Sequence, residues 1–400
     1  MSADVATVRH AREGTESLLA NIDVRLLGVV VALSLFGLVM VASASISLAD
    51  RQLGAPFHYL ERQLLFMVMA YGLGWLTISM PLSIWQRASM PFLLLSLLLL
   101  LLLLLPGVGR EVNGAVRWLP VGVFNLQVSE VVKLGVMVYL AGWLVRHGEH
   151  VRHSMSGFLV PLGVLALIGV LLLSQPDFGA AVVITATGMG MLFLAGVPLW
   201  RFGVVALAAG ATGFALIVGS PYRWERLTTF VNPWADPFNS GFQLTQSLIA
   251  IGRGEWFGVG LGGSVQKLFY LPEAHTDFLF AVLAEELGLA GVSVVILLFG
   301  YLCWRAFSTG AASLRAGRPF AGYLCLGIGL WLSMQTCVNI GVTMGLLPTK
   351  GLTLPLMSYG GSSLLMTVVA LAMVVRADYE LRIRAVAARP LRRREVSDAE

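Results

Sequence analysis

Long runs of apolar residues alternate with short polar segments along almost the whole chain. Ten of these runs are long enough to cross the roughly 30 Å of hydrocarbon in a bilayer as helices. The pattern therefore predicts an all-α polytopic membrane protein with ten transmembrane helices. The predicted spans are residues 26–49, 64–80, 90–105, 131–145, 158–174, 180–197, 202–220, 278–304, 320–347 and 362–375.

The amino-acid composition supports this prediction. Hydrophobic residues make up 57% of the chain, charged residues only 12%, and the mean hydropathy is +0.81. A soluble domain typically carries about 25% charged residues, so this chain cannot expose all of its surface to water. The net charge of +5 does not indicate nucleic-acid binding, because in membrane proteins the positions of Lys and Arg report orientation.

The distribution of arginine predicts which side of the membrane each segment faces. Both terminal segments and the short loops on their side are rich in arginine, whereas the loops on the other side hold few cations. The richer side is cytoplasmic by the positive-inside rule, so both termini are cytoplasmic. The chain then divides into an N-terminal tail (1–24), a membrane domain (25–376) and a basic C-terminal tail (377–400) that contacts lipid headgroups. The long loop of residues 221–276, between the seventh and eighth spans, is periplasmic.

The acidic end of this long loop is the first candidate site. Asp277 stands at the start of the eighth span, with Glu273 and His275 in the same turn. Aspartate is also a favoured helix N-cap, whose carboxylate accepts backbone N–H groups. A cap needs one acid, and the three titratable residues here exceed that need. We therefore favour a functional Asp277 over a capping one.

Two further acidic residues lie deeper in the same span. Glu285 follows Asp277 by eight residues, which places it about 12 Å further along a helix and on nearly the same face, and Glu286 adjoins it. A carboxyl group at that depth must be paired, protonated or in a wet cavity. A structural role and a catalytic or relay role both stay open for this pair.

Charged residues at other outer positions are candidates for binding an anionic substrate. Glu130 and Lys133 lie one helical turn apart at the start of the fourth span. They either neutralise each other or leave Lys133 to meet a lipid phosphate. The long loop holds cations beside an amphipathic, glycine-rich stretch (242–269), and they either stay solvated or hold a lipid-borne anion at the headgroup level. These loop cations are Arg223, Arg226, Arg253 and Lys267, and an earlier outer loop holds Arg110 and Arg117.

Several long motifs resemble the signature of the SEDS proteins, the family of FtsW, RodA and SpoVE. The clearest are LPEAHTDFLFAVLAEELG at 271–288 and the segment 339–363, which ends in SYGGSS. NGAVRW at 113–118 and NPWADP at 232–237 are also similar, as is the pair Arg223 and Arg226. The similarity covers nearly the whole chain between the tails and is greatest to the cell-division branch of the family.

The resemblance implies a peptidoglycan glycosyltransferase that polymerises lipid II into glycan strands on the outer leaflet of the bacterial inner membrane, at the division septum. It implies a class B penicillin-binding protein (FtsI in division) and other division proteins as partners. The family's catalytic Asp falls on Asp277, and its functionally sensitive Arg and Lys fall on Arg117 and Lys133. The residues expected to contact the substrate are Arg117, Glu130, Lys133, Arg223, Arg226, Gln243, Lys267, Glu273, His275, Ser358 and Ser362.

Two positions depart from the family pattern. Val128 stands where a Pro is usual, so the entry to the fourth span is expected to differ. Glu255 stands where a Gly is usual, but it lies in the long loop and away from the proposed base.

The implied reaction needs little from the protein. A base must take the proton of an acceptor hydroxyl, and cations must neutralise the leaving pyrophosphate, whereas a glycosidase needs two carboxyl groups about 5–9.5 Å apart. Asp277 would supply the base, with Arg117, Lys133 or the loop arginines as cations. Mg²⁺ or Mn²⁺ beside Asp277 would suit the hard oxygen ligands there, although the sequence shows no ligand set, and no organic cofactor is expected.

Two other functions stay open at this point. A lipid II flippase would also use buried charges, with Lys133 and Glu285 lining a route through the bilayer. A carrier needs a site that opens to both sides, however, and the charges here cluster outside. A non-catalytic scaffold would recruit the penicillin-binding partner through its helices, but it leaves the acidic cluster at 273–277 unexplained.

Overall fold

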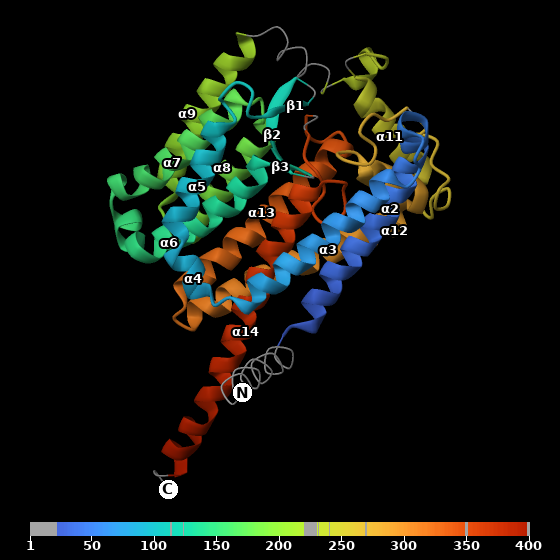
Figure 1. Cartoon of the computed structure of the whole chain (residues 1–400). Helices are drawn as coiled ribbons and strands as arrows, with labels where there is room; N and C mark the ends of the chain where they lie inside the picture. The colour runs from blue at the N-terminus through green and yellow to red at the C-terminus, as the bar shows by residue number, and fades with distance from the viewer. Residues whose placement is uncertain are drawn as a thin grey trace.

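The structure is a computed structural model that describes residues 22–112, 114–122, 124–219, 230, 232–239, 241–268, 270–348 and 351–397. It is mostly helical, with one small sheet (Figure 1). The longer helices are α2 (Val24–Leu53), α3 (His58–Ser79), α5 (Ser89–Leu102), α6 (Val128–His153), α7 (Met155–Ser174), α8 (Phe178–Leu194), α9 (Leu199–Val218), α11 (Phe242–Gly254), α12 (Leu279–Arg315), α13 (Pro319–Thr343) and α14 (Gly361–Ser397). The shorter elements are α4 (Leu82–Arg87), the 3-10 turn η1 (Pro233–Ala235) and the strands β1 (Arg110–Val112), β2 (Ala115–Val121) and β3 (Phe124–Gln127).

Each predicted span overlaps one helix of the structure, namely α2, α3, α5 to α9 and α12 to α14. By length and composition, five helices in the described part of the chain could cross a membrane: α2, α6, α7, α12 and α13. Shorter apolar helices lie at α5, α8 and the first half of α9. The apolar pattern thus located the helices correctly.

Local sequence explains where several helices begin and end. The Asp23 side chain caps α2 by accepting the backbone N–H groups of Arg25 and Leu26, and Gly54 ends it in the left-handed conformation that glycine adopts without strain. Pro319 starts α13 at a position where its missing N–H costs nothing. The last helix, α14, continues to Ser397 through the predicted start of the C-terminal tail. The N-terminal tail lies outside the described residues up to residue 21.

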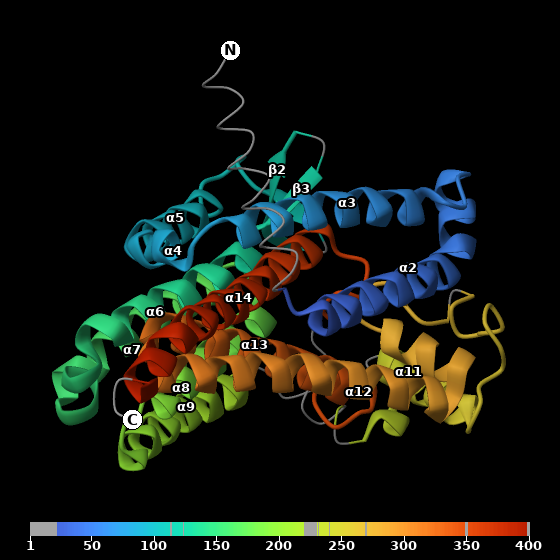
Figure 2. The same ribbon diagram turned by 90° about the horizontal axis from the view of Figure 1, so that it is seen from below.

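The centre of the bundle is formed by α6, α13 and α14, with α2, α3 and α12 on one side and α5, α7 and α8 on the other (Figure 2). Among the five long apolar helices, α6 has the largest buried share, and almost every residue from Val128 to Gly142 is buried. A helix that is apolar all round packs on all sides against protein. Lys133 of α6 is therefore enclosed by neighbouring helices.

The prediction of a purely α-helical chain was wrong for residues 110–127. These residues form an antiparallel sheet in the order β1-β2-β3, in which Trp118 of β2 pairs with Arg110 on one side and Gln127 on the other. The two turns contain Gly114 and Gly122, both with positive φ, as hairpin turns require. The β-branched and aromatic residues Val116, Trp118 and Val121 between Gly114 and Gly122 indicate a strand between two turns, but the segment is too short to be found in a search for long apolar runs.

The segment 351–360 enters the bundle between helices that are distant in sequence. A Cβ on Gly37 of α2 would lie 2.4 Å from the Cα of Met357, and one on Gly179 of α8 would lie 2.9 Å from the Leu352 side chain. Glycine at these two positions lets the segment lie directly against the helices. We call residues 351–360 the inserted loop.

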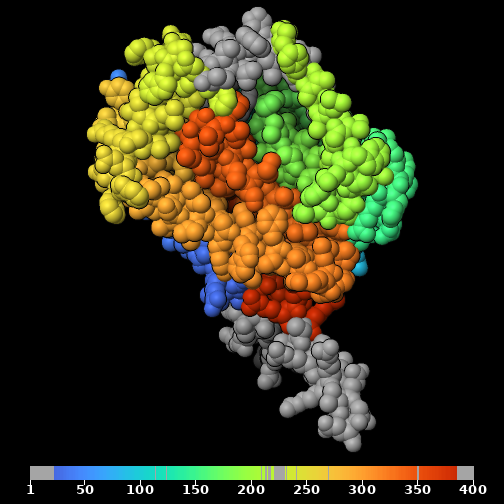
Figure 3. Space-filling model, turned by 180° about the vertical axis from the view of Figure 1, so that it is seen from behind, coloured from blue at the N-terminus to red at the C-terminus, as the bar shows by residue number. Residues whose placement is uncertain are grey.

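The arrangement separates two ends of the molecule. The sheet and α11 lie at one end of the bundle, and the first residues of α2 and the last of α14 lie at the other (Figure 1). On the back face, the orange-red region around 340–357 lies between the yellow region around 232–268 and the green helices. The surface is hollowed where it meets the green residues (Figure 3). The inserted loop thus lies at the end that carries the sheet.

Candidate functional site

Asp277 lies in a tight turn just before α12 and does not cap that helix. The N-cap position is Phe278, and no side chain forms a cap hydrogen bond there. Instead, the turn is closed by the carbonyl of Glu273, which accepts the N–H groups of Thr276 and Phe278. The Asp277 carbonyl accepts the side-chain amide of Asn339 at 2.9 Å. The backbone is therefore held, while the carboxylate is not used by the helix start.

The surroundings of Asp277 raise the pKa of its carboxyl group to about 7. Burial is the largest cause, because it disfavours the charged form, and the negative charges of Glu273 and Asp177 act in the same direction. The positive charge of Arg117 opposes them. The side chain is still partly exposed. A carboxylate with a pKa near 7 can accept a proton at neutral pH.

The inserted loop passes against this carboxylate. A Cβ on Gly351 would lie 2.9 Å from Oδ2 of Asp277. Asn339 of α13 fixes the same region, since its amide donates to the carbonyls of both Leu352 (2.5 Å) and Asp277 (2.9 Å). One side chain thus holds the loop and the turn at a set separation.

Arg117 reaches the site from β2. Its guanidinium donates to the carbonyls of Gln175 (3.3 Å) and Pro176 (2.5 Å), in the turn before α8. The next residue, Asp177, caps α8 with Oδ1, while its Oδ2 is buried without a hydrogen-bond partner. The positive charge of Arg117 acts on Asp277, whereas its predicted contact with the substrate stays a prediction.

Lys133 is buried, and its ammonium group makes two hydrogen bonds. Its Nζ donates to Glu130 at 2.8 Å and to Gln335 of α13 at 2.7 Å, and it lies 5.1 Å from the centroid of the Trp331 ring. Gln335 in turn donates to the carbonyl of Thr353 in the inserted loop at 3.0 Å. The self-neutralising interpretation of Glu130 and Lys133 holds in this structure, and the pair supports the loop that faces Asp277.

His275 is buried and packs against two aromatic rings that also contact each other. Its ring centroid is 4.6 Å from that of Tyr59 and 5.5 Å from that of Tyr359, and its carbonyl accepts the N–H of Tyr359. Burial lowers the pKa of His275, with Glu273 acting in the opposite direction, so the imidazole is neutral at pH 7. Glu273 itself is exposed and accepts the Thr276 hydroxyl at 2.7 Å.

Glu285 and Glu286 hold the long loop to α12. Glu285 accepts Ser264 Oγ at 2.5 Å and the N–H of Val265 at 3.1 Å, and Glu286 accepts Lys267 Nζ at 2.7 Å. Both side chains are fully buried. These contacts favour the structural role that the sequence left open for them, and they show Lys267 as a buried ion-pair partner.

Five predicted substrate contacts remain, of which three are described and two lie outside the described residues. Gln243 is exposed on α11. Ser358 bonds the N–H of Leu354 at 2.9 Å, and Ser362 bonds the N–H of Gln127 at 2.9 Å. Both serines are buried and fasten the inserted loop and β3 internally. Arg223 and Arg226 are the two outside the described residues.

The sequence analysis missed Asn339, Gln335 and Asp177 as parts of this site. The two amides lie within an apolar span, and polar groups at that depth are a signal for function. Asp177 stands just before a predicted span, where a cap is the ordinary interpretation. Gly351 appeared only as part of a motif, because its closeness to Asp277 depends on the fold.

Within the described ranges, no group of three or more His, Cys, Asp and Glu side chains lies close enough to hold a metal ion. The predicted Mg²⁺ or Mn²⁺ beside Asp277 therefore has no complete ligand set among these residues. The unpartnered Asp177 Oδ2 is a free hard oxygen in the same neighbourhood. Further ligands would come from a substrate or from residues outside the described ranges.

Residues 24–383 match the family model of FtsW, RodA and SpoVE, described as cell cycle protein. The chain is 59% identical over 373 residues to a probable peptidoglycan glycosyltransferase FtsW of Alkalilimnicola ehrlichii, covering 93% of each chain. It is 57% identical to the probable peptidoglycan glycosyltransferase FtsW of Halorhodospira halophila, covering 97% of this chain and 98% of that one.

Two solved structures have a similar fold. One comes from work on the "structural coordination of polymerization and crosslinking by a peptidoglycan synthase complex", with a TM-score of 0.73, 31% identity and coverage of 90% of this chain and 98% of that one. The other is the rod shape determining protein RodA of Thermus thermophilus, with a TM-score of 0.65, 30% identity and coverage of 89% and 96%.

Proposed function

The chain belongs to the FtsW, RodA and SpoVE family of cell cycle proteins, and from this premise we propose that it is a peptidoglycan glycosyltransferase that polymerises lipid II during cell division. The relatives above are named as probable peptidoglycan glycosyltransferases. The observation that carries the mechanism is the Asp277 carboxylate, which no helix cap uses and whose pKa is raised to about 7.

In the proposed reaction, Asp277 takes the proton from an acceptor sugar hydroxyl as that oxygen attacks the anomeric carbon of the donor. The bond from this carbon to the lipid pyrophosphate breaks, and the pyrophosphate leaves as an anion. Arg117, whose charge acts on Asp277, would lie near the developing negative charge. Such general-base help is typically worth 10²–10⁴-fold in rate.

Lys133 and Lys267 take positioning roles in this proposal. Each is buried in an ion pair, with Glu130 and Glu286 respectively. Lys133 acts through Gln335 on the inserted loop, and Lys267 holds the long loop to α12. Direct contact with the pyrophosphate would fall to Arg117 and to the loop arginines Arg223 and Arg226.

We further propose a topology of ten spans with both termini in the cytoplasm. Each predicted span overlaps a helix, and the start of α2 is joined to α12 and α14 at one end of the bundle by ion pairs of Asp23 with Arg305 and Arg382. The sheet, Asp277 and residues 221–276 would then face the periplasm. The protein would reside in the bacterial inner membrane at the division septum.

A class B penicillin-binding protein, FtsI in division, is the proposed partner, because the product strands need crosslinking. A similar chain was solved in work on a peptidoglycan synthase complex that coordinates polymerization and crosslinking. The other proposed partners are further division proteins and membrane lipid. Nucleic acid is not a proposed partner.

We also propose that Mg²⁺ or Mn²⁺ binds beside Asp277. When bound, such an ion would neutralise pyrophosphate oxygens, and Asp277 with the free Oδ2 of Asp177 would be its protein ligands. Pyrophosphate oxygens of the substrate would complete the site.

The experiment that tests the function separates strand synthesis from lipid transport. The purified protein, with its partner, is reconstituted in proteoliposomes that carry lipid II, and glycan strands and lipid translocation are measured independently. A polymerase forms strands from outward-facing lipid II without moving lipid. Translocation without strand synthesis would support a flippase. The absence of both activities would support a scaffold. Either result would contradict the proposal.

A further inference from the structure

A cavity of about 610 Å³ lies at the end of the bundle where α2 begins and α14 ends. It is lined by α4, by the turn between α12 and α13, and by residues 376–384 of α14. This end is far from Asp277: Pro319 at the cavity and Asn339 at the site lie on the same helix, about 30 Å apart by helical rise. The cavity is thus separate from the proposed active site.

The residues that line this cavity carry an excess of positive charge. They include Arg318, Arg376 and Arg384, and Glu380 is the one acid among the described lining residues. Glu380 bonds Arg376 Nε and the N–H of Leu82, and it also pairs with Arg318. One carboxylate cannot neutralise three guanidinium groups, so the lining has a formal charge of +2.

Part of this charge has no protein partner. Nη1 of Arg318 is buried without a hydrogen bond, and Arg384 is exposed with no ion pair among the described residues. Burial lowers the pKa of Arg318, and the charges of Arg384 and Arg376 add to that effect. The positive charges of Arg384 and Arg376 therefore repel that of Arg318. A bound anion would relieve this repulsion.

The start of α13 adds hydrogen-bond donors at the same place. Pro319, Phe320 and Ala321 line the cavity, and no side chain caps the helix. The first N–H groups of a helix have no partner within it, and the helix dipole places partial positive charge there. An uncapped helix start facing three arginines favours a multiply charged anion such as a phosphate.

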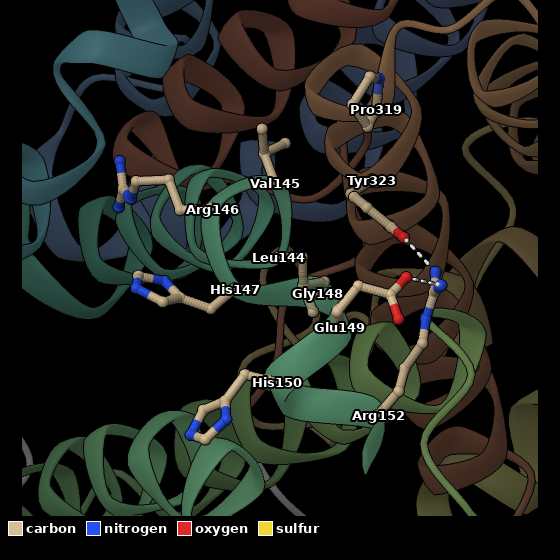
Figure 4. Close-up of a pocket in the computed structure, with 10 residues that line it drawn as sticks. All are labelled: Leu144, Val145, Arg146, His147, Gly148, Glu149, His150, Arg152, Pro319 and Tyr323. Atoms are coloured by element: carbon tan, nitrogen blue, oxygen red, sulfur yellow. Dashed lines mark hydrogen bonds and ion pairs between the residues drawn. The ribbon is translucent and has the colours of Figure 1, made fainter. Parts of the chain in front are cut away.

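The neighbouring cavity provides a comparison, because its Arg152 has hydrogen-bond and ion-pair partners within the protein. It has about 390 Å³ and shares Val145 and Pro319 with the larger cavity. There, Arg152 donates to Glu149 and to the Tyr323 hydroxyl (Figure 4), and also to the carbonyl of Ala195. Arg146 and Arg152 exceed Glu149 by one charge there, so the formal excess is +1 in the smaller cavity against +2 in the larger one.

We propose that the larger cavity binds the phosphate group of an anionic ligand, either an anionic phospholipid headgroup or a soluble phosphate. Arg318, Arg384 and the first N–H groups of α13 hold the phosphate. Leu82, Phe320 and Ile383 in the same lining offer apolar contacts that suit the glycerol and upper acyl chain of a lipid. In the proposed topology this cavity opens at the cytoplasmic leaflet, where anionic headgroups attract basic segments.

The test compares lipid retention between variants of the full-length protein. Each is purified from mixed micelles with equal phosphatidylglycerol and phosphatidylcholine, and the retained lipid is counted by native mass spectrometry. We expect parental protein to retain phosphatidylglycerol selectively, and Arg318→Gln or Arg384→Gln to retain roughly fivefold less. The matched control is Arg315→Gln, an exposed arginine three residues before Arg318 that lies outside the lining; it should behave as the parent.

A second arm identifies the source of the phosphate. Delipidated protein is titrated with inorganic phosphate and pyrophosphate, and its melting temperature is followed. Suppose that the first arm shows no selective retention of phosphatidylglycerol. If phosphate or pyrophosphate then stabilises the parent and Arg315→Gln but not Arg384→Gln, the site binds a soluble phosphate. Arg384 makes no ion pair with the described residues, so its variant should fold normally. If Arg384→Gln and Arg315→Gln were indistinguishable in both arms, the cavity would not be a phosphate site.

Discussion

The state of one carboxyl group decides what this site can do. Asp277 is held through its backbone by Asn339, while its side chain is excluded from helix capping and partly desolvated. Desolvation raises the pKa of an aspartate, and a neighbouring acid raises it further. The site therefore combines a fixed position with a proton affinity suited to neutral pH.

Glu273 is expected to set the pH range of activity. Its negative charge raises the pKa of Asp277, so Glu273→Gln should lower that pKa. A base works when deprotonated, and the rise in rate with increasing pH should therefore move to lower pH in the variant. Rates of strand synthesis measured from pH 5 to 9 check this. An unchanged midpoint would mean that Glu273 does not act on the catalytic base.

Gly351 is expected to be needed for the geometry of Asp277. A Cβ at this position would lie 2.9 Å from the carboxylate, so Gly351→Ala should displace Asp277 and reduce strand synthesis by roughly 10²-fold, as small misplacements do. Gly360→Ala is the matched control in the same loop, because its Cβ would meet only ordinary contacts at 3.5 Å or more. Equal activity of the two variants would contradict this role.

At the residue scale, sequence located the acids better than the cations. Asp277, Glu273 and His275 are close in sequence, and the structure keeps them in one turn. From the sequence alone, Lys133 could have bound a phosphate, because its partner Gln335 is 202 positions away in the chain. A long-range partner of this kind leaves no local pattern, so burial of the cation could not be predicted.

At the scale of elements, a break in α12 receives the long loop. Gly288 has φ 63° and ψ −164°, and the N–H groups of Val259 and Gly260 donate to the carbonyls of Glu285 and Glu286 just before it. Glu255, where the family usually has Gly, adopts φ 43° in this loop. The family preference thus has a conformational reason, since glycine adopts positive φ without strain.

The buried pair of Lys267 and Glu286 is expected to hold this loop. Lys267→Met leaves Glu286 buried with Ser43 as its remaining hydrogen-bond partner, which typically costs about 3–5 kcal/mol. The double variant Lys267→Met with Glu286→Gln should be more stable than the single one. Melting temperatures of the purified proteins measure the difference.

The control for this prediction is Arg253→Met. Arg253 lies 3.5 Å from Glu285 and its side chain is 46% exposed. Without Arg253, the buried Glu285 still accepts hydrogen bonds from Ser264 and Val265, so Arg253→Met should cost less stability than Lys267→Met. If Lys267→Met were no less stable than Arg253→Met, the buried pair would not hold the loop.

The apolar periodicity predicted the helices, and the missed elements share a physical cause. Runs such as 131–145 and 320–347 can only be satisfied as helices in lipid, because a helix pairs its own backbone groups. The sheet at 110–127 lies at one end of the bundle and the inserted loop lies between helices, and that constraint does not fix their conformations. Their conformations depend on glycines and on distant contacts such as that of Gly37 with Met357.

At the scale of the whole molecule, charge separates into two ends. Acidic residues and Arg117 gather around Asp277, while arginines gather around the start of α13. Helices α6 and α13 run between the two ends. Near the end with Asp277 they are joined by the buried hydrogen bond of Lys133 with Gln335, which also bonds the inserted loop. This polarity agrees with chemistry on one face of the membrane and lipid contact on the other.

A divalent metal is expected to be held only together with substrate. The described residues offer no three-ligand cluster, so the protein alone should bind Mn²⁺ weakly, at the millimolar level typical of incomplete sites. Adding a lipid pyrophosphate should tighten Mn²⁺ binding, and excess chelator should slow strand synthesis. Full activity in chelator would remove the metal from the proposal.

Strand synthesis from purified lipid II by Asp277→Asn, with the partner present, tests the central claim most directly. The substitution keeps the size of the side chain and removes its capacity to accept a proton. We predict folded protein with a rate reduced by about 10²–10⁴-fold, while the parental rate rises with pH through about 7. An Asp277→Asn variant that polymerises lipid II at the parental rate would contradict Asp277 as the base.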